Sequence, residues 1–195
     1  VQKIIIGYDH RFGKNRTANI DDLINFGTQY GFEVEQISAQ EIDDISISST
    51  KIRTALEEGD IQLANEYLGY RYFLSGTVVK GKQLGRTIGF PTANIELEEA
   101  YKLVPQNGVY IVRVVVDSKT IFGMMNIGFN PTVQGKKKTI EVHLFDFDYD
   151  IYNRKIQVAF LQRIRSEKKF ESVEVLKEQL KKDKAFSLDY LNQIE

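Results

Sequence analysis

The sequence predicts an α+β protein, with a C-terminal antiparallel β-barrel followed by a helix and an N-terminal part that is a partial α/β domain. Over residues 1–68, strand-like and helix-like patterns alternate, which is typical of a parallel sheet covered by helices. From Tyr72 onward the apolar residues follow a period of two, and a helical pattern returns only after Ser172. We therefore expect two domains, residues 1–68 and 69–195.

The first domain should begin with a buried strand at residues 4–6, which ends at Gly7. A helix over residues 20–30 and a second strand over 32–37 follow it. Two strands are too few for an independent doubly wound sheet. Because a buried strand stands next to Val1, and no Met or signal peptide precedes it, we expect a missing N-terminal segment.

Two more helices should end this domain, and glycines mark their boundaries. Residues 50–58 form a helical pattern that Gly59 can terminate. Asp60 can then cap a short helix over residues 61–68, which ends at a second glycine.

The second domain should consist mainly of strands. The alternating pattern predicts them over residues 73–79, 109–116, 120–127, 139–147 and 155–164. Residues 117–119 are predicted to form a tight hairpin turn, and residues 148–153 to join the last two strands. Such a run favours a small antiparallel barrel.

A helix is predicted at the C-terminal end. Ser172 can cap it, and Val173, Leu176 and Leu180 are spaced to face the core. A separate short helix is expected over residues 186–191.

Composition excludes several functional classes. The chain has 195 residues, 42% of them hydrophobic and 27% charged, with a net charge of −1. The chain has no overall positive charge that would predict a nucleic-acid partner. No apolar run reaches the ~20 residues that span a bilayer. The chain has no cysteine, which excludes disulfides, thiolate metal sites and a cysteine nucleophile and suits a reducing compartment, so a cytoplasmic location is expected.

One stretch, residues 81–94, carries the chemistry expected of a nucleotide loop. It combines three glycines, two cations, a proline and two oxygen ligands: Gly81, Gly85, Gly89, Lys82, Arg86, Pro91, Thr92 and Asn94. Glycines allow close backbone approach to phosphates, and two hard oxygens on one side of an extended segment suit Mg²⁺. The alternative is an ordinary glycine-rich hairpin loop. The stretch matches neither a Walker A loop nor a dinucleotide fingerprint.

This stretch resembles the nucleotide loop of riboflavin kinases, whose Pro-Thr-Ala-Asn motif stands here at residues 91–94. Further matching blocks follow at residues 108–110, 125–132, 140–147 and 165–170. Upstream, residues 7–13 and 47–53 resemble the adenylyltransferase half of bacterial bifunctional riboflavin kinase/FMN adenylyltransferase, also called FAD synthetase. The resemblance covers essentially the whole chain.

The resemblance implies a fold and a reaction. The fold would be a Greek-key barrel of about six strands with a C-terminal helix, after a partial nucleotidyltransferase domain. The reaction would transfer the γ-phosphate of ATP to riboflavin with Mg²⁺, giving FMN and ADP, and the full-length parent would also convert FMN to FAD. Within the loop, the residues named above would bind ATP, with Thr92 and Asn94 at the metal.

Glu141 is the predicted catalytic base. Its neighbours Ile140 and Val142 are apolar, so the carboxylate lies on the opposite face of the strand. From the residues alone a solvated strand glutamate is the alternative, whereas the resemblance places Glu141 at the family's catalytic position. His143 lies on the same face and is expected to serve packing or hydrogen bonding.

The resemblance also implies a flavin site. Arg165 and Phe170 would lie in the segment that closes over the flavin, and Asn126 near the floor of the site; the block of Gly108, Val109 and Tyr110 would border it. Each has an alternative. Arg165 can pair with Glu167, Phe170 can act as a hydrophobic staple, and Tyr110 can be a barrel residue.

The adenylyltransferase part is incomplete. Asp9 and Arg11 match one family block, although His10 replaces its usual phenylalanine. Ser49, Thr50 and Arg53 match a Ser-Ser-Thr-x-x-Arg element at a helix start, where simple N-capping is the alternative. The family's histidine-containing nucleotide motif is absent, so these residues alone are not expected to adenylylate FMN.

The sequence therefore predicts a riboflavin kinase, carried by residues 69–195, whose partners are the small molecules riboflavin, ATP, ADP and FMN. The alternative is a module that binds flavin or nucleotide without turnover. The joint presence of Thr92, Asn94 and Glu141 argues against it, because binding alone needs no base beside a metal.

Overall fold

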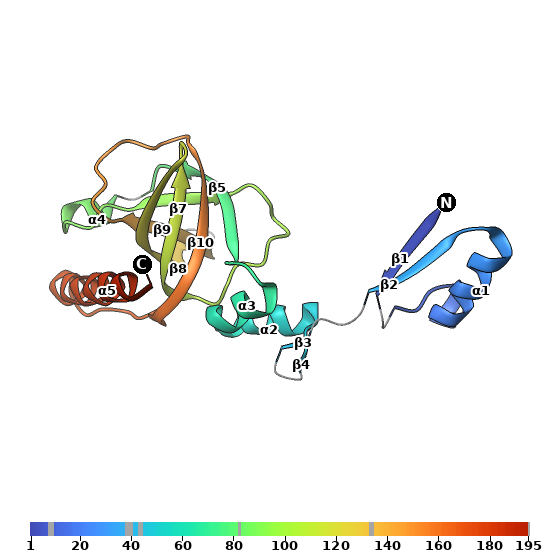
Figure 1. The fold of residues 1–195 in the computed structure, drawn as a ribbon. Helices are drawn as coiled ribbons and strands as arrows, with labels where there is room; N and C mark the ends of the chain where they lie inside the picture. The colour runs from blue at the N-terminus through green and yellow to red at the C-terminus, as the bar shows by residue number, and fades with distance from the viewer. Residues whose placement is uncertain (8–9, 38–40, 43–44, 82, 133–134, 195) are drawn as a thin grey trace. The chain divides into compact units, whose positions relative to one another are not determined.

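The computed structural model describes the whole chain except residues 8–9, 38–40, 43–44, 82, 133–134 and 195 (Figure 1). It divides into two compact units, Val1–Ser48 and Ser49–Glu195.

The first unit is a small α/β arrangement. Its elements are β1 (Lys3–Gly7), the 3₁₀ turn η1 (Lys14–Arg16), α1 (Ile20–Tyr30), β2 (Glu33–Ile37), β3 (Glu41–Ile42) and β4 (Ile45–Ser46). Strands β1 and β2 pair in parallel, as the alternation predicts, and β3 and β4 form a short antiparallel pair that was not predicted.

Helix α1 has the predicted bounds because both ends are capped. The Asn19 side chain accepts the N–H of Asp22 at 3.1 Å, the Asp22 carboxylate accepts the N–H of Asn19 at 2.9 Å, and Gly31 ends the helix in the left-handed region.

The prediction that β1 is buried is wrong. Only Ile6 is buried, whereas the side chain of Ile5 is 59% exposed. A strand is buried on both faces only where layers cover both faces of its sheet. Helix α1 packs against β2, but within the described part of residues 1–48 nothing covers the face that carries Ile5.

The second unit contains a closed six-stranded barrel. Its elements are α2 (Ser49–Glu58), α3 (Ile61–Leu68), β5 (Phe73–Val79), α4 (Leu84–Thr87), β6 (Ala93–Leu97), β7 (Gly108–Val116), β8 (Lys119–Thr132), β9 (Gly135–Leu144), β10 (Lys155–Ser166) and α5 (Val173–Ile194). All strand pairs are antiparallel, in the order β10-β5-β6-β9-β8-β7. Because β7, β8 and β9 are consecutive neighbours and β10 returns beside β7, the barrel contains a Greek key, which confirms the expected fold.

The predicted hairpin turn and the predicted connection between the last two strands are both present. Asp117 and Ser118 have φ angles of 46° and 65° between paired strands β7 and β8, as a type I′ turn requires. Residues 148–153 join β9 and β10 as predicted, although these two strands are not neighbours in the barrel, so the connection is not a hairpin. Asn153 adopts the left-handed conformation, which asparagine tolerates, with φ 61°, and donates its N–H to the Val78 carbonyl at 2.9 Å.

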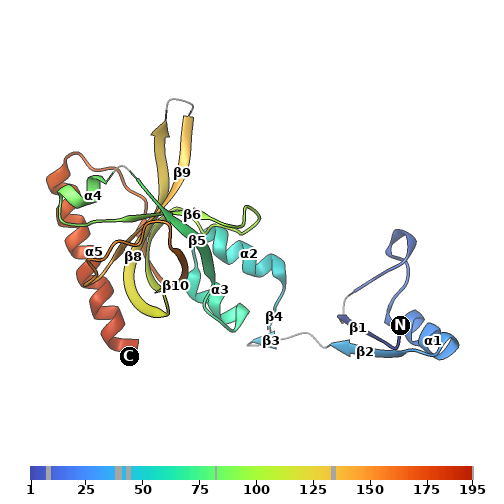
Figure 2. The same cartoon turned by 90° about the horizontal axis from the view of Figure 1, so that it is seen from above.

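Side chains along the barrel strands point alternately into two apolar clusters, one inside the barrel and one on its outer face. Residues such as Val112, Val142 and Phe160 fill the interior of the barrel. A second cluster, which includes Val109, Met124 and Leu191, lies on the outer face of the strands where α5 covers it (Figure 2). This outer cluster matters for function because α5 and α4 form the walls of a cavity over it.

Helix α5 differs from the prediction. Ser172 caps it as expected, with its hydroxyl accepting the N–H of Val175 at 3.3 Å. The helix then runs through residues 186–191 without a break, since no glycine or proline interrupts it. Leu176 and Leu180 pack on the outer cluster, but Val173 is 46% exposed because it stands in the first turn, beyond the edge of the barrel contact.

Helices α2 and α3 belong to the barrel unit by their contacts. Leu56 and Ile61 are buried in the same cluster as the barrel interior. The Asn65 side chain accepts the N–H of Tyr72 at 2.6 Å and donates to the Phe160 carbonyl at 3.1 Å. The compact unit thus begins at Ser49, whereas the division into family domains near Gly69 stays a prediction.

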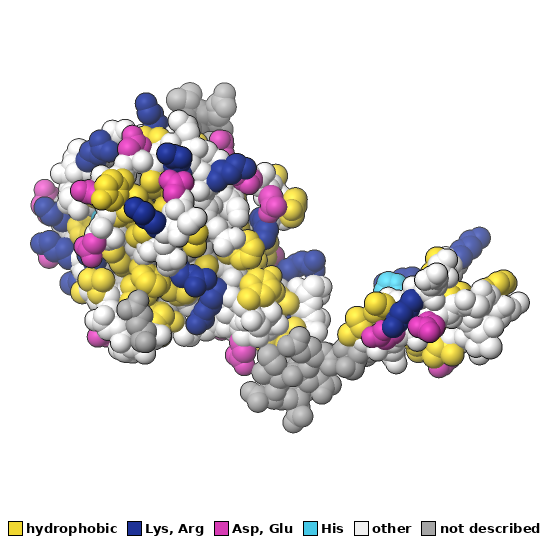
Figure 3. Space-filling model, turned by 45° about the horizontal axis from the view of Figure 1, so that its top comes forward, with side chains coloured by type: hydrophobic (Ala, Val, Ile, Leu, Met, Phe, Trp, Pro, Cys, Tyr) yellow, Lys and Arg dark blue, Asp and Glu magenta, His cyan; other side chains and the backbone are white. Residues whose placement is uncertain are grey.

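The surface carries mixed charge. On the face drawn in Figure 3, lysine and arginine side chains are interspersed with aspartate and glutamate, in keeping with the net charge of −1. Within the described ranges, the helices are all too short or too polar to cross a membrane.

Candidate active site

Five of the predicted site residues lie in a single row around the barrel. Arg165 on β10 is paired with Val109 on β7, Val109 with Asn126 on β8, Asn126 with Glu141 on β9, and Glu141 with Asn94 on β6. Residues directly opposite each other in an antiparallel sheet project from the same face. The barrel thus brings together residues that are up to 71 positions apart in sequence, Asn94 to Arg165, on its outer face.

A cavity of about 320 Å³ lies over four residues of this row, Arg165, Val109, Asn126 and Glu141, between the barrel, α4 and α5; Asn94 is not part of its lining. Predicted site residues in its lining are Gly85, Thr92, Val109, Asn126, Glu141, Arg165 and Phe170. Its apolar walls come from both sides: Ile88, Phe90, Met124, Leu176 and Leu180. The cavity, called the outer cavity below, is therefore mostly apolar with a few polar groups, as pockets for flat organic ligands are.

A second cavity of about 180 Å³ adjoins the first. It is lined by aromatic side chains of the β9–β10 connection, including Phe147, Tyr149 and Tyr152, and by the cation of Arg86. Thr92 lines this aromatic cavity and the outer cavity alike.

The junction of the two cavities holds a hydrogen bond between predicted site residues. The Thr92 hydroxyl donates to Glu141 Oε2 at 3.2 Å, and the Glu141 side chain is half-buried. As predicted, Glu141 lies on the face opposite Ile140 and Val142, which point into the barrel. A hydroxyl that donates its hydrogen still has lone pairs to offer a second partner.

His143 holds the backbone beside Thr92. Its Nδ1 lies 2.8 Å from the Pro91 carbonyl oxygen and must carry the hydrogen, because a carbonyl only accepts. The pKa of His143 is lowered, mainly by burial of the ring. The hydrogen bond to Pro91 raises this pKa in part, and the positive charge of nearby Lys184 lowers it further. The ring is only 8% exposed and packs edge-on against Phe90, so the expected packing and hydrogen-bonding role is confirmed.

The glycine-rich stretch is compact rather than open. A Cβ on Gly81 would lie 2.0 Å from Asn94 Nδ2, and one on Gly85 would lie 2.1 Å from the Phe90 carbonyl oxygen, so neither position accepts a side chain without a shift. Gly85 lies within helix α4 (Leu84–Thr87), a single turn that the sequence did not predict. Gly89 follows it at φ 84°, and Lys82 lies outside the described residues.

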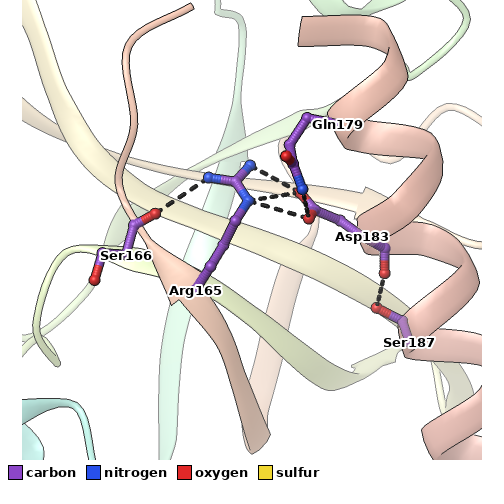
Figure 4. A network of polar contacts seen from close by, with 5 residues as sticks. All are labelled: Arg165, Ser166, Gln179, Asp183 and Ser187. Atoms are coloured by element: carbon purple, nitrogen blue, oxygen red, sulfur yellow. Dashed lines mark hydrogen bonds and ion pairs between the residues drawn. The ribbon is translucent and has the colours of Figure 1, made fainter. Parts of the chain in front are cut away.

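Arg165 is held by a residue that sequence reasoning missed. Figure 4 shows its guanidinium reaching from β10 to α5, where it forms a two-pronged ion pair with Asp183; the shortest distance is 2.7 Å, from Nη2 to Oδ2. The alternative pairing with Glu167 is wrong, since Glu167 accepts the Phe129 N–H at 3.0 Å and the Asn107 side chain instead. The Arg165 guanidinium lies 5.6 Å from the centre of the Phe170 ring.

The block of Gly108, Val109 and Tyr110 divides between two environments. Val109 lines the outer cavity, but Tyr110 is fully buried in the barrel interior and donates its hydroxyl to the Gln106 carbonyl. Burial raises the pKa of Tyr110, although nearby Arg163 opposes the shift. This placement supports the alternative in which Tyr110 is a barrel residue. Gly108 lies in neither lining and allows β10 to approach, since its Cβ would lie 2.6 Å from the Arg165 carbonyl oxygen.

The predicted adenylyltransferase residues fall in both units. Arg11 is exposed in the first unit, and Asp9 lies outside the described residues. Ser49 and Thr50 begin α2 in the second unit and are exposed, and Arg53, one turn further along, donates from Nη1 to Ser49 Oγ at 3.4 Å.

Comparison with known proteins agrees with this geometry. The sequence profile described as riboflavin kinase matches residues 68–191. The chain belongs to the riboflavin kinase family. A second profile, described as FAD synthetase, matches residues 1–51.

Several curated relatives of this riboflavin kinase family member are longer than it is. The protein named bifunctional riboflavin kinase/FMN adenylyltransferase from Bacillus subtilis is 41% identical; the alignment covers 100% of this chain and 62% of that protein. The Haemophilus influenzae protein of the same name is 45% identical, with 94% of this chain and 59% of that protein aligned. The Escherichia coli protein of the same name is 39% identical, with 97% of this chain and 60% of that protein aligned.

The fold also has a close match among solved structures. A crystal structure from Streptococcus pneumoniae, described as a macrolide-efflux protein, superposes with a TM-score of 0.84 at 38% identity, over 94% of this chain and 59% of that one.

Proposed function

We propose that the barrel unit transfers the γ-phosphate of ATP to the 5′-hydroxyl of riboflavin, giving FMN and ADP. The observation that carries this proposal is the position of Thr92, which lines two adjoining cavities and donates a hydrogen bond to Glu141 where they meet. Two substrates that exchange a phosphoryl group need two sites that touch at one point, with a base at that point.

The two cavities suit different substrates. The outer cavity has the apolar walls that a flavin ring needs, with Asn126 and Arg165 as polar anchors. The aromatic cavity offers ring faces for a nucleotide base and the Arg86 cation for phosphates. Both the name of the matching profile and the names of the relatives support riboflavin as the alcohol.

The residues present fit Mg²⁺ delivered with ATP. No group of three or more acidic or histidine side chains that could hold a metal occurs in the described part of the chain. Magnesium usually takes only one or two protein ligands and fills its shell with water and phosphate oxygens, so Thr92 and Asn94 suffice as its hard oxygen donors. When bound there, the ion neutralises charge on the transferring phosphates.

The chain's own residues then accept the proton and orient the reacting groups. Glu141 accepts the proton of the riboflavin 5′-hydroxyl while the hydroxyl oxygen forms a bond to the γ-phosphorus of ATP. The bond between the γ-phosphorus and the bridging oxygen breaks, and that oxygen leaves with ADP. The Thr92 hydroxyl keeps the carboxylate oriented through its hydrogen bond, and His143 fixes the peptide before Thr92. The apolar walls of the outer cavity exclude water that would otherwise compete as acceptor.

We further propose that adenylylation of FMN to FAD belongs to the longer parent protein. The FAD synthetase profile covers only residues 1–51, and the relatives that carry both names are longer than this chain. A cytoplasmic location, where riboflavin and ATP are both available, accords with the absence of cysteine.

Incubation of the chain with riboflavin, ATP and Mg²⁺, followed by chromatographic separation of riboflavin, FMN and FAD, tests the proposal. FMN without FAD is the expected result. Retained flavin binding without any product would instead support a binding module, and FAD formation would show that this chain holds a working adenylyltransferase site.

Replacement of Thr92 by Ala should raise the KM for Mg²⁺–ATP and lower kcat/KM by about 10- to 100-fold, because a charge-assisted hydrogen bond and an oxygen donor are lost. Thr92→Ser, which keeps the hydroxyl, is the control and should stay within a few-fold of wild type. Steady-state kinetics with varied ATP measure both. An unchanged KM in the alanine variant would remove Thr92 from the nucleotide site.

A further inference from the structure

The second unit buries a carboxylate that plays no part in the proposed phosphoryl transfer. Asp183 on α5 is 2% exposed and accepts hydrogen bonds from Arg165 Nε and Nη2 and, at 2.9 Å, from Gln179 Nε2 (Figure 4). One turn on, the Ser187 hydroxyl donates to the Asp183 carbonyl at 2.7 Å. The side chain is thus fully engaged on the barrel side of the helix.

Docking of α5 does not require a charged pair. Leu176, Leu180 and Leu191 already pack on the outer cluster, and apolar contacts of this kind hold a helix to a sheet well. Buried ion pairs often add little stability compared with apolar residues of the same volume. The pair therefore calls for another explanation, and Arg165 suggests one because it lines the outer cavity.

The contacts of Arg165 leave part of its guanidinium available. Three of its five N–H groups are used, by Asp183 and by the Ser166 carbonyl at 3.2 Å, and the other two bond no described residue. The same group lies against the Phe170 ring, which also lines the cavity. A guanidinium clamped on one edge presents the remaining N–H groups in a fixed plane.

We propose that Asp183 is a positioning residue for the riboflavin site: it fixes the plane of the Arg165 guanidinium, which in turn orients Phe170 and offers two N–H donors to the bound flavin. This inference rests on the proposed function of the outer cavity. The competing explanation is structural, in which Asp183 only anchors α5 to the barrel.

Asp183→Asn is the first test. The amide NH₂ would face an Arg165 donor, so the guanidinium loses its fixed plane while the side-chain volume is kept. We expect kcat/KM for riboflavin to fall on the order of 10²-fold, with the KM for ATP unchanged. The control is Asp189→Asn, the same change at an exposed carboxylate on the same helix, which should behave as wild type.

A milder variant keeps the test open if Asp183→Asn does not fold. Gln179→Leu removes one hydrogen bond to Asp183 and leaves the ion pair, so a loss of riboflavin affinity of about 3- to 10-fold is expected in a folded protein. Quenching of riboflavin fluorescence measures this affinity directly, without turnover.

A double-mutant cycle tests whether Asp183 acts on riboflavin binding through Arg165. In the Arg165→Met background, Asp183→Asn should lower riboflavin affinity no further, because Asp183 acts through Arg165. A further loss of similar size, or wild-type riboflavin affinity in folded Asp183→Asn and Gln179→Leu, would overturn the positioning role. If the wild-type chain itself makes no FMN, the proposed function fails, an outcome distinct from either.

Discussion

Replacement of Glu141 by Gln should lower kcat for FMN formation by about 10²- to 10⁴-fold while the Kd for ATP stays within a few-fold of wild type. Gln at this position can still accept the hydrogen bond from Thr92, so the junction between the two cavities keeps its shape. An amide cannot take the proton of the 5′-hydroxyl. The loss should therefore appear in turnover rather than in substrate binding.

The matched control is Glu96→Gln, the same substitution at an exposed glutamate on β6 outside both cavity linings. It should leave turnover unchanged. Rates of FMN formation at saturating riboflavin and ATP, with ATP affinity measured by calorimetry, decide the matter. If Glu141→Gln turns over at nearly the wild-type rate, Glu141 is not the base, and the proton must leave through another group or water.

Local patterns predicted most elements of the fold, and the errors concern what local patterns cannot report. Strand β5 and helices α1 and α3 have the predicted bounds, since period and capping residues specify them. The pairing of β10 with β5 and β7, rather than with β9, depends on closure of the whole barrel, which no turn signal at residues 148–153 encodes. The short strand β6 was missed because Asn94 and Glu96 make its five residues look polar.

The site shows the same division between local and tertiary information. The face of Glu141 follows from strand alternation, but its alignment with Asn126 and Asn94 depends on strand register. Asp183 was overlooked because it stands among lysines and resembles a solvated helix face. A signal was nevertheless present: Asp183 falls on the helical stripe that begins at Leu176 and Leu180, where a polar residue indicates a buried partner.

Deletion of residues 1–68 should unfold the barrel, whereas deletion of residues 1–48 should not. Helices α2 and α3 bury Leu56 and Ile61 against the barrel, at about 1.5–3 kcal/mol for each side chain. Loss of Asn65 leaves the N–H of Tyr72 and the carbonyl of Phe160 without this partner, at about 1–3 kcal/mol each. The sum, roughly 5–12 kcal/mol, rivals the ~5–15 kcal/mol that stabilises a typical domain.

Thermal unfolding followed by circular dichroism compares the chains 49–195 and 69–195 with the full chain. Asn65→Ala in the full chain isolates the polar part and should lower Tm, with a loss of about 2–6 kcal/mol, while Asn107→Ala serves as an exposed-contact control. If 69–195 unfolds cooperatively at the Tm of the full chain, the family division near Gly69 is also the physical one. If the chain 69–195 does not fold, helix α2, which begins at Ser49, is a structural part of the kinase. A phosphate bound at the start of α2 would then bind to the same cooperatively folded unit that holds the flavin site.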